Sequence, residues 1–240
     1  MRSISKTSIL TMVVLILLLS VSAQAAYTNV NLPTLNTDLT TWSDGSAYNN
    51  LFPSSQTFAG VPFQLQLNSS GYNAYEAFGN NTLDISTSIY GATNVYTLIN
   101  TAYGSSGSTV GSITFIGNGG ADYTVNLIEG YNVRDHYFNP NPFVNTTTAP
   151  YVTQAVFGLN QSGYAHLDMQ DFALPSAFQT QTLTDIQFAG INAGYPQGEP
   201  FIAGLTVAGG SAPVPEPSTF LLLGASLAGL AGLRLRRRNR

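Results

Sequence analysis

TLDISTSIY, at residues 82–90, carries the pattern on which the fold of this chain rests. Leu83, Ile85 and Ile89 alternate with polar residues along this stretch. Successive side chains of a β-strand point to opposite faces, so the alternation predicts a strand with one face on a core and the other toward solvent. No long window between residues 26 and 213 shows the 3.6-residue apolar period of a helix.

Short β-rich runs recur on both sides of this stretch, separated by Gly, Asn, Ser and Pro. Alternation is clear again in Phe63–Leu67 and Tyr123–Leu127. Glycines in Gly104–Ser108 and Gly117–Gly120 suit turns because they adopt positive φ angles. The predicted strands are Thr57–Leu67, Thr82–Tyr90, Asn94–Asn100, Val110–Ile116, Tyr123–Ile128, Tyr151–Leu159, Ala165–Asp171, Leu183–Phe188 and Phe201–Val207. They predict an all-β fold, an antiparallel β-sandwich that is jelly-roll-like.

The charges are unevenly distributed along the 240 residues. Seven of the eight Lys and Arg residues lie at the two ends, which leaves Arg134 as the only one between residues 26 and 213. Eleven of the twelve acids lie in that range, so this body has a formal charge of −10. A body with one cation cannot neutralise several phosphates, which excludes nucleic-acid binding. The absence of Cys excludes disulfides, thiol nucleophiles and Cys-ligated metals.

The first 25 residues have the three parts of a secretory signal peptide: a positive n-region, an apolar run and small residues before a cleavage site. We expect signal peptidase to cut before Ala26. An uncleaved membrane anchor is the alternative. The residues concerned are Arg2 and Lys6 in the n-region and Ala23 and Ala25 at the cleavage site.

The C-terminus, residues 213–240, is also tripartite. A Pro-Glu-Pro segment is followed by an uncharged apolar stretch over residues 219–233 and an Arg-rich tail. A helix over that stretch spans about 22 Å, short of a ~30 Å hydrocarbon core, and the Arg side chains extend its reach by snorkelling. We expect a single transmembrane helix whose cationic tail stays cytoplasmic. The motif residues are Val214, Pro215, Glu216, Pro217 and Ser218, and the topogenic charges are Arg2, Lys6, Arg234, Arg236, Arg237, Arg238 and Arg240.

This order of parts resembles the bacterial PEP-CTERM protein-sorting signal. The resemblance covers about the last 27 residues. It implies recognition and removal of the tail by an exosortase, a membrane-embedded cysteine-protease-like enzyme, in a Gram-negative bacterium that makes extracellular polysaccharide and biofilm. It also implies an inner-membrane intermediate and then a place on the cell surface or in the extracellular matrix. A permanent single-span anchor is the alternative.

The body resembles galactose-binding-like jelly-roll domains. The matching runs are Phe58–Phe63, Val95–Asn100, Val110–Phe115 and Gly130–Asp135. Domains of this kind occur as accessory carbohydrate-binding modules of glycosidases and in other exported proteins. The resemblance implies the sandwich fold and, as ligand, a glycan.

Aromatic residues in the predicted loops suit glycan binding, because rings stack on sugars while neighbouring amides bond hydroxyls; the alternative is that they cap the core. We expect a glycan site, if the body has one, at Trp42, Asp44 and Asn49. Arg134 has two interpretations: a donor to sugar hydroxyls, or a structural ion pair with an acid such as Asp122 or Glu129. The other loop aromatics are Tyr48, Tyr72, Tyr75, Tyr103, Tyr137 and Tyr195.

Metal binding is left open by the sequence. His166 and Asp168 would share one face of a strand, but zinc needs three or four ligands, so we expect them on a solvated face with Leu167 and Met169 on the core. Acids without counter-cations suit a structural Ca²⁺ ion, although no calcium-loop motif identifies its ligands. No other cofactor is expected. The candidate oxygen ligands include Asp38, Asp44, Asp84, Asp122, Asp171 and Asp185.

No catalytic motif such as a nucleophile elbow, a P-loop or HExxH is present. We expect a non-enzymatic exported protein with a structural or interaction role in biofilm or exopolysaccharide. The alternatives are a carbohydrate-binding module and a hydrolase of matrix glycans that uses two of the eleven acids. The expected partners are signal peptidase, exosortase, the inner membrane transiently and an extracellular polysaccharide. The expected domains are a signal peptide (1–25), a β-sandwich (26–212) and the sorting signal (213–240).

Overall fold

The structure is a computed structural model that describes residues 26–42, 48–137, 143–157, 165–191 and 195–209. The expected signal helix and transmembrane helix both lie outside these residues. Within the described ranges, no helix is long and apolar enough to cross a membrane. The helical elements that lie entirely within the described residues are two short 3₁₀ turns, η1 (Leu39–Thr41) and η3 (Ser176–Thr180).

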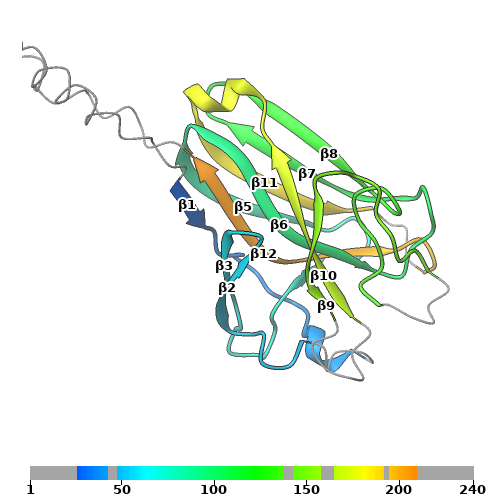
Figure 1. The fold of residues 1–240 in the computed structure, drawn as a ribbon. Helices are drawn as coiled ribbons and strands as arrows, with labels where there is room; N and C mark the ends of the chain where they lie inside the picture. Colours follow the sequence, from blue (N-terminus) through cyan, green and yellow to red (C-terminus); the bar gives the residue numbers. More distant parts are fainter. Residues whose placement is uncertain (1–25, 43–47, 138–142, 158–164, 192–194, 210–240) are drawn as a thin grey trace, which may run out of the picture.

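Two antiparallel sheets face each other, as Figure 1 shows. The large sheet has the order β1-β12-β6-β10-β9, and β4 also pairs with β12; the small sheet has the order β5-β11-β7-β8. The large sheet consists of β1 (Ala26–Asn29), β4 (Tyr75–Glu76), β6 (Ala92–Ala102), β9 (Val152–Phe157), β10 (His166–Ala173) and β12 (Glu199–Gly209). The small sheet consists of β5 (Thr82–Tyr90), β7 (Thr109–Gly117), β8 (Asp122–Ile128) and β11 (Thr182–Gly190). The predicted all-β sandwich is confirmed.

The strand order is that of a jelly roll. From β4 onward the chain alternates between the sheets, except that β7 and β8 are neighbours in the small sheet and β9 and β10 in the large one. The central strands then read β4-β12-β6-β10 against β5-β11-β7-β8, which is the order produced by two nested Greek keys. Strands β1 and β9 extend the large sheet at its edges.

One hydrophobic core fills the space between the two sheets. Val95 and Ile99 of β6 pack against the cluster that contains Phe115 of β7 and Ile186 and Phe188 of β11, and all five side chains are fully buried. The apolar row of residues 82–90 contributes to this core through its first half, as the alternation predicts.

A second core lies against the opposite face of the large sheet. There the hairpin of β2 (Ser54–Phe58) and β3 (Val61–Leu65) covers the sheet, and Phe63 and Leu65 join a buried cluster with Leu98 and Phe201. The central strands of the large sheet are therefore buried on both faces, and β12 is buried from its second residue to its last. A strand in such a position has no solvated face, so it loses the polar alternation.

The hairpin corrects one predicted strand. Residues 57–67 do not form a single strand, because Ala59 and Gly60 adopt φ angles of 48° and 85° and reverse the chain between β2 and β3. Thr82–Tyr90 is observed with the predicted bounds, and the other predicted strands match β6 to β12 with shifted ends. Two short strands, β1 and β4, were not predicted.

Candidate functional site

The segment Val133–Tyr137 is inserted between β6 and β10 at one end of the large sheet. Asp135 forms a parallel bridge with Thr101 of β6, and Tyr137 forms an antiparallel bridge with Ala165, just before β10. Backbone hydrogen bonds join the segment to both sides: the Thr101 N–H donates to Arg134 O at 3.0 Å and the His166 N–H to His136 O at 2.9 Å. The two strands are therefore held apart here, and their direct pairing stops at Leu98 and Met169.

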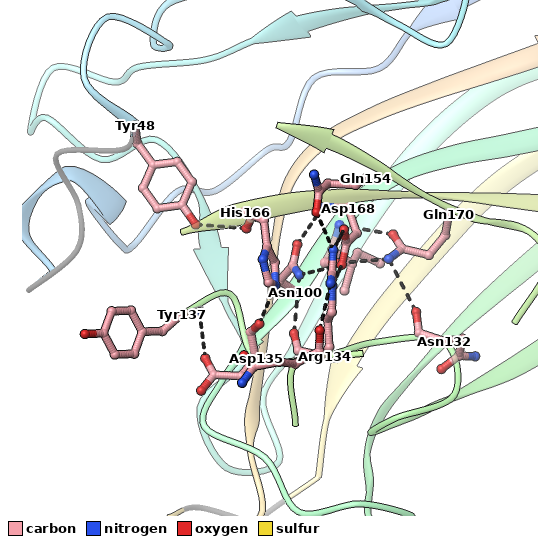
Figure 2. Close-up of polar contacts among 12 residues, drawn as sticks. Tyr48, Asn100, Asn132, Arg134, Asp135, Tyr137, Gln154, His166, Asp168 and Gln170 are labelled. Carbon is pink, nitrogen blue, oxygen red and sulfur yellow. Dashed lines mark hydrogen bonds and ion pairs between the residues drawn. The ribbon is translucent and has the colours of Figure 1, made fainter. Parts of the chain in front are cut away.

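Arg134 holds this insertion through its side chain. Its Nε and Nη2 atoms lie 2.6 and 2.7 Å from the two carboxylate oxygens of Asp168, as Figure 2 shows. Nη1 donates to the carbonyl of Asn145 at 2.7 Å and Nη2 also to Oε1 of Gln154 at 3.0 Å. The Asp168 side chain is fully buried, and the Arg134 side chain is 12% exposed. This is a buried bidentate ion pair.

Amide side chains replace the sheet hydrogen bonds that the insertion removes. Gln170 accepts from the Ile99 N–H at 3.1 Å and donates to the Ile99 carbonyl at 2.8 Å. Asn100 accepts from the Asp168 N–H at 2.7 Å and donates to Oδ2 of Asp168 at 2.9 Å. Because a buried unpaired peptide group is costly, these two amides stabilise a gap that would otherwise be unfavourable.

A pocket of about 370 Å³ opens beside the insertion. Its carboxylates come from neighbouring strands: Glu76 from β4, Glu199 from β12 and Asp135 from the inserted segment, while Ala102 of β6 lies between the last two. The described residues that line it are Trp42, Glu76, Phe78, Ala102, Tyr103, Asp135, His136, Tyr137, Phe143 and Glu199. The pocket therefore spans four adjacent chain segments at one end of the large sheet.

Aromatic rings form much of the pocket wall. Trp42 packs edge-on against His136, with ring centroids 4.6 Å apart, and against Phe201 at 5.3 Å. On another part of the wall, Tyr103 packs against Phe143 at 5.3 Å. Tyr195, which is mostly exposed, lies 5.2 Å from the ring of Tyr103 and extends this aromatic surface outward.

The pocket is acidic, and its lining among the described residues contains no Lys or Arg. Burial raises the pKa of Glu76 to about 7, and the Glu199 carboxyl adds to this effect while the Thr37 hydroxyl opposes it. Burial also raises the pKa of Glu199. Burial, with His166 nearby, lowers the pKa of His136 to about 3, so this imidazole is neutral at physiological pH. Carboxyls and neutral rings are thus the groups that a ligand would meet.

A further carboxyl, that of Glu129, is buried beside Gly104 and Gly198. It is 1% exposed, and neither of its oxygens has a hydrogen-bond partner among the described residues. The nearby Thr101 hydroxyl lowers the pKa of the Glu129 carboxyl only partly, because this hydroxyl donates to the Tyr103 carbonyl at 2.8 Å. Burial therefore dominates and raises the pKa of Glu129 to about 8. A side chain at Gly104 would collide with this carboxyl, so the niche requires glycine there.

The sequence-predicted glycan site is only partly assembled. Trp42 lines the pocket, whereas Asn49 is exposed outside it and Asp44 lies outside the described residues. Arg134 forms an ion pair with Asp168, which confirms the structural interpretation, although the acid is neither Asp122 nor Glu129. Of the other loop aromatics, Tyr103 and Tyr137 line the pocket, Tyr195 adjoins it, Tyr48 and Tyr75 are in the cores, and Tyr72 is exposed elsewhere.

The prediction that His166 and Asp168 lie on a solvated face was also wrong. Both are fully buried, as is Leu167 between them, since β10 is covered on both faces. Nε2 of His166 lies 2.8 Å from the Asp135 carbonyl, and the Tyr48 hydroxyl donates to the His166 carbonyl at 3.2 Å (Figure 2). The single-face pattern used for prediction does not apply to a strand between two layers.

The described residues include no group of three or more His, Asp or Glu side chains suited to a metal ion. Several of the candidate calcium ligands bond to protein donors instead. Asp38 caps η1 through the Thr40 N–H at 3.0 Å, Asp84 accepts from Gln187 at 2.9 Å, and Asp171 accepts from Asn94 at 2.7 Å.

The pocket residues that sequence analysis missed are mainly Glu76, Glu199 and Phe143. No local pattern singles out these acids, because each is one of eleven in the body. Glu76 and Glu199 come together because strand pairing places β4, β12 and β6 side by side. This pairing joins segments that are far apart in the sequence.

The C-terminus matches a family model described as the PEP-CTERM protein-sorting motif, over residues 213–238. The predicted sorting signal is confirmed by this match, and it indicates an exported protein that an exosortase processes through a membrane-anchored intermediate. These residues lie outside the part of the chain that the structure describes.

Solved structures similar to the chain include three carbohydrate-binding modules. The C-terminal CBM6 of LamC, a marine laminarinase from Zobellia galactanivorans, is 9% identical over 76% of this chain and 99% of its own, with a TM-score of 0.30. CBM35 from Cellvibrio japonicus Abf62 is 20% identical over 79% and 91%, with a TM-score of 0.23. The xylan-binding module CBM15 is 11% identical over 78% and 97%, with a TM-score of 0.30. No curated protein matches the chain. The superpositions are too loose to transfer a ligand or a site.

Proposed function

We propose that the β-sandwich is a non-catalytic glycan-binding domain, which the sorting motif delivers to the cell surface or extracellular matrix. The observation that carries this proposal is the pocket at the end of the large sheet, which combines exposed ring surface with hydrogen-bond acceptors. Its volume of about 370 Å³ lies in the range of small-ligand sites. In this role the protein attaches to an extracellular polysaccharide and contributes to a biofilm or a capsule-like matrix.

The aromatic surface supports a sugar ligand on chemical grounds. Phe78 and Tyr103 line the pocket and are 48% and 41% exposed, so apolar ring area is available to a ligand. The carboxyls of Glu76 and Glu199 are acceptors for sugar hydroxyls, which are donors. A large apolar surface with a few convergent polar groups is the usual composition of a small-molecule site.

The proposal also assigns a role to each of three segments of the chain. Residues 1–25 act as a cleaved signal peptide, residues 26–212 as the binding domain and residues 213–240 as the sorting signal.

A glycan array with the full-length chain, purified in detergent, tests this proposal. Replacing the rim side chain in Tyr103→Ala should weaken binding of any positive glycan at least about tenfold, the loss typical of a well-placed aromatic contact. Tyr72→Ala is the matched control, because Tyr72 is 39% exposed and lies outside the pocket. Absence of binding to every glycan, or equal losses in both variants, would contradict the proposal. Cleavage of a bound oligosaccharide would instead favour a hydrolase.

A further inference from the structure

The carboxyls of the pocket have no cation of their own. Arg134 is the only Lys or Arg between residues 26 and 213, so no other part of the body can supply one. The Arg134 guanidinium is already engaged by Asp168, Asn145 and Gln154. The remaining basic group of the pocket is the neutral imidazole of His136. The described residues therefore offer the pocket no positive side chain, and an ionised carboxyl of Glu76 or Glu199 would be stabilised by a cationic group of a ligand.

Glu76 presents an unused oxygen to this pocket. Its side chain lines the cavity and is 4% exposed. Oε2 accepts from the Thr37 hydroxyl at 3.0 Å, whereas Oε1 has no hydrogen-bond partner among the described residues. The backbone N–H of Glu76 is held by Asn36 Oδ1 at 2.8 Å, and its strand pairs with Phe201 of β12. The free acceptor is thus fixed in position by its neighbours.

The groups around Glu76 favour a cationic ligand. Glu199 belongs to the adjacent strand β12 and lines the same cavity as Glu76. Its charge adds to burial in raising the pKa of Glu76. Asp135 lines the same cavity, on the far side of Ala102. The faces of tryptophan, tyrosine and phenylalanine rings attract an ammonium group, and Trp42, Tyr103 and Phe143 contribute such rings. Carboxylate acceptors with aromatic walls are a combination suited to an ammonium rather than to an anion.

We propose that the ligand is a glycan bearing primary ammonium groups, a polymer of hexosamines with free amines, whose ammonium donates to Glu76 and Glu199. This inference rests on the proposed glycan-binding function and specifies its substrate class. Uronic acids and sulfated sugars are excluded from the pocket by like-charge repulsion. A neutral sugar lacks the positive charge that the carboxyls need, so it binds more weakly than the amine.

The test compares two oligosaccharides of one length and linkage, glucosamine hexamer and N-acetylglucosamine hexamer, by calorimetry with the full-length chain in detergent near pH 7. The free amine should bind at least about tenfold more tightly, the value of one charge-assisted hydrogen bond. Glu76→Gln should remove this preference, since glutamine keeps the shape and the contact with Thr37 but not the charge. Asp84→Asn, which removes a surface acid of the small sheet, is the charge-matched control and should keep the preference.

Three other outcomes would overturn the inference, and they are distinguishable. Equal or tighter binding of the acetylated hexamer, weakened by Tyr103→Ala, contradicts the ammonium but leaves the glycan-binding function standing. A lysine hexapeptide that binds as tightly as the glucosamine hexamer contradicts the sugar as the ligand. Binding of neither hexamer nor of any arrayed glycan contradicts the glycan-binding function itself.

Discussion

Arg134 forms a bidentate ion pair with Asp168, with Nε 2.6 Å from Oδ2 and Nη2 2.7 Å from Oδ1. The pair joins the inserted segment to β10 at the place where β6 and β10 separate. A lone cation in an acidic body could have bound a ligand. The Arg134 guanidinium is instead engaged by Asp168 and stabilises the fold. The planar guanidinium matches both oxygens at once, which lysine could not do.

Removal of Arg134 should destabilise the protein strongly. Arg134→Met leaves the fully buried Asp168 without its partner and should lower the free energy of unfolding by about 3–5 kcal/mol. Urea denaturation monitored by fluorescence measures this loss. The double variant Arg134→Met/Asp168→Leu should recover most of it, because neither charge remains. A single-variant loss below about 1 kcal/mol would show that the pair behaves like a surface salt bridge.

The stability of the protein should fall as the pH rises from about 6.5 to 8. Below about pH 6.5 the buried, neutral His136 and His166 change the stability in the opposite direction, because burial lowers their pKa values to about 3 and about 4. Burial raises the pKa of Glu129 to about 8, so the folded state retains a proton that the unfolded chain loses near its ordinary carboxyl pKa of about 4.3. The unfolded state therefore binds fewer protons in this window, and the free energy of unfolding decreases with pH. Glu76, with a pKa of about 7, contributes in the same direction up to that pH.

Glu129→Gln isolates the contribution of this carboxyl. The variant should be more stable than the natural protein by about 2–4 kcal/mol at pH 8.5, and the difference should shrink to less than about 1 kcal/mol at pH 4.5, where the unfolded chain is only about half ionised at Glu129. Denaturant titrations across this range give both values. Asp84→Asn, on an exposed acid, should leave the slope unchanged. A Glu129→Gln slope equal to that of the natural protein would rule out a buried, protonated Glu129.

Gly198 should not tolerate a side chain. Its φ of +119° is unfavourable for other residues, and an added Cβ would lie 3.0 Å from both Glu129 Oε1 and Val110 Cγ1. Gly198→Ala should therefore lower the free energy of unfolding by about 2–3 kcal/mol. Gly71→Ala is the control, because Gly71 also has a positive φ, +85°, but nothing within 4 Å of an added Cβ, and it should cost about 1 kcal/mol. Equal losses would mean that the niche around Glu129 can relax.

The β2–β3 hairpin should be an integral layer of the domain. Phe63 is 1% exposed in the second core, so Phe63→Ala should lower the free energy of unfolding by about 3–5 kcal/mol. Leu67→Ala, at a side chain that is 44% exposed just beyond the hairpin, should cost less than about 1 kcal/mol. Thermal melts of both variants make the comparison. A small effect of Phe63→Ala would indicate that the hairpin detaches independently of the sandwich.

The released protein should lack both ends of the chain. Intact-mass measurement of the protein shed from cells should give a chain that begins near Ala26 and lacks the apolar stretch after Ser218. Replacing the Pro-Glu-Pro segment, with Pro215→Ala, Glu216→Ala and Pro217→Ala together, should keep the full tail on the protein in the membrane fraction. A shed form that retains residues 219–240 would contradict removal of the tail.

Local sequence patterns predicted the sandwich because most of its strands show a regular alternation of apolar and polar residues. Thr82–Tyr90 was found with its predicted bounds, since β5 packs on a single core and keeps its alternation. The Thr57–Leu67 prediction missed a turn at Ala59, because a non-glycine residue with positive φ carries little signal. The environment of β10 could not be predicted for another reason: its cover on the second face comes from residues about 100 positions earlier in the chain.

The sequence by itself determined the C-terminal sorting motif, the strand-rich body and its single cation, since each of these is a property of composition or of neighbouring residues. Only the tertiary structure decided where that cation acts and which acids converge. Glu76, Asp135 and Glu199 are far apart in the chain and meet because the jelly-roll pairing puts β4, β12, β6 and the inserted segment side by side. That pairing depends on the burial of two cores at once, which no local window of the sequence contains.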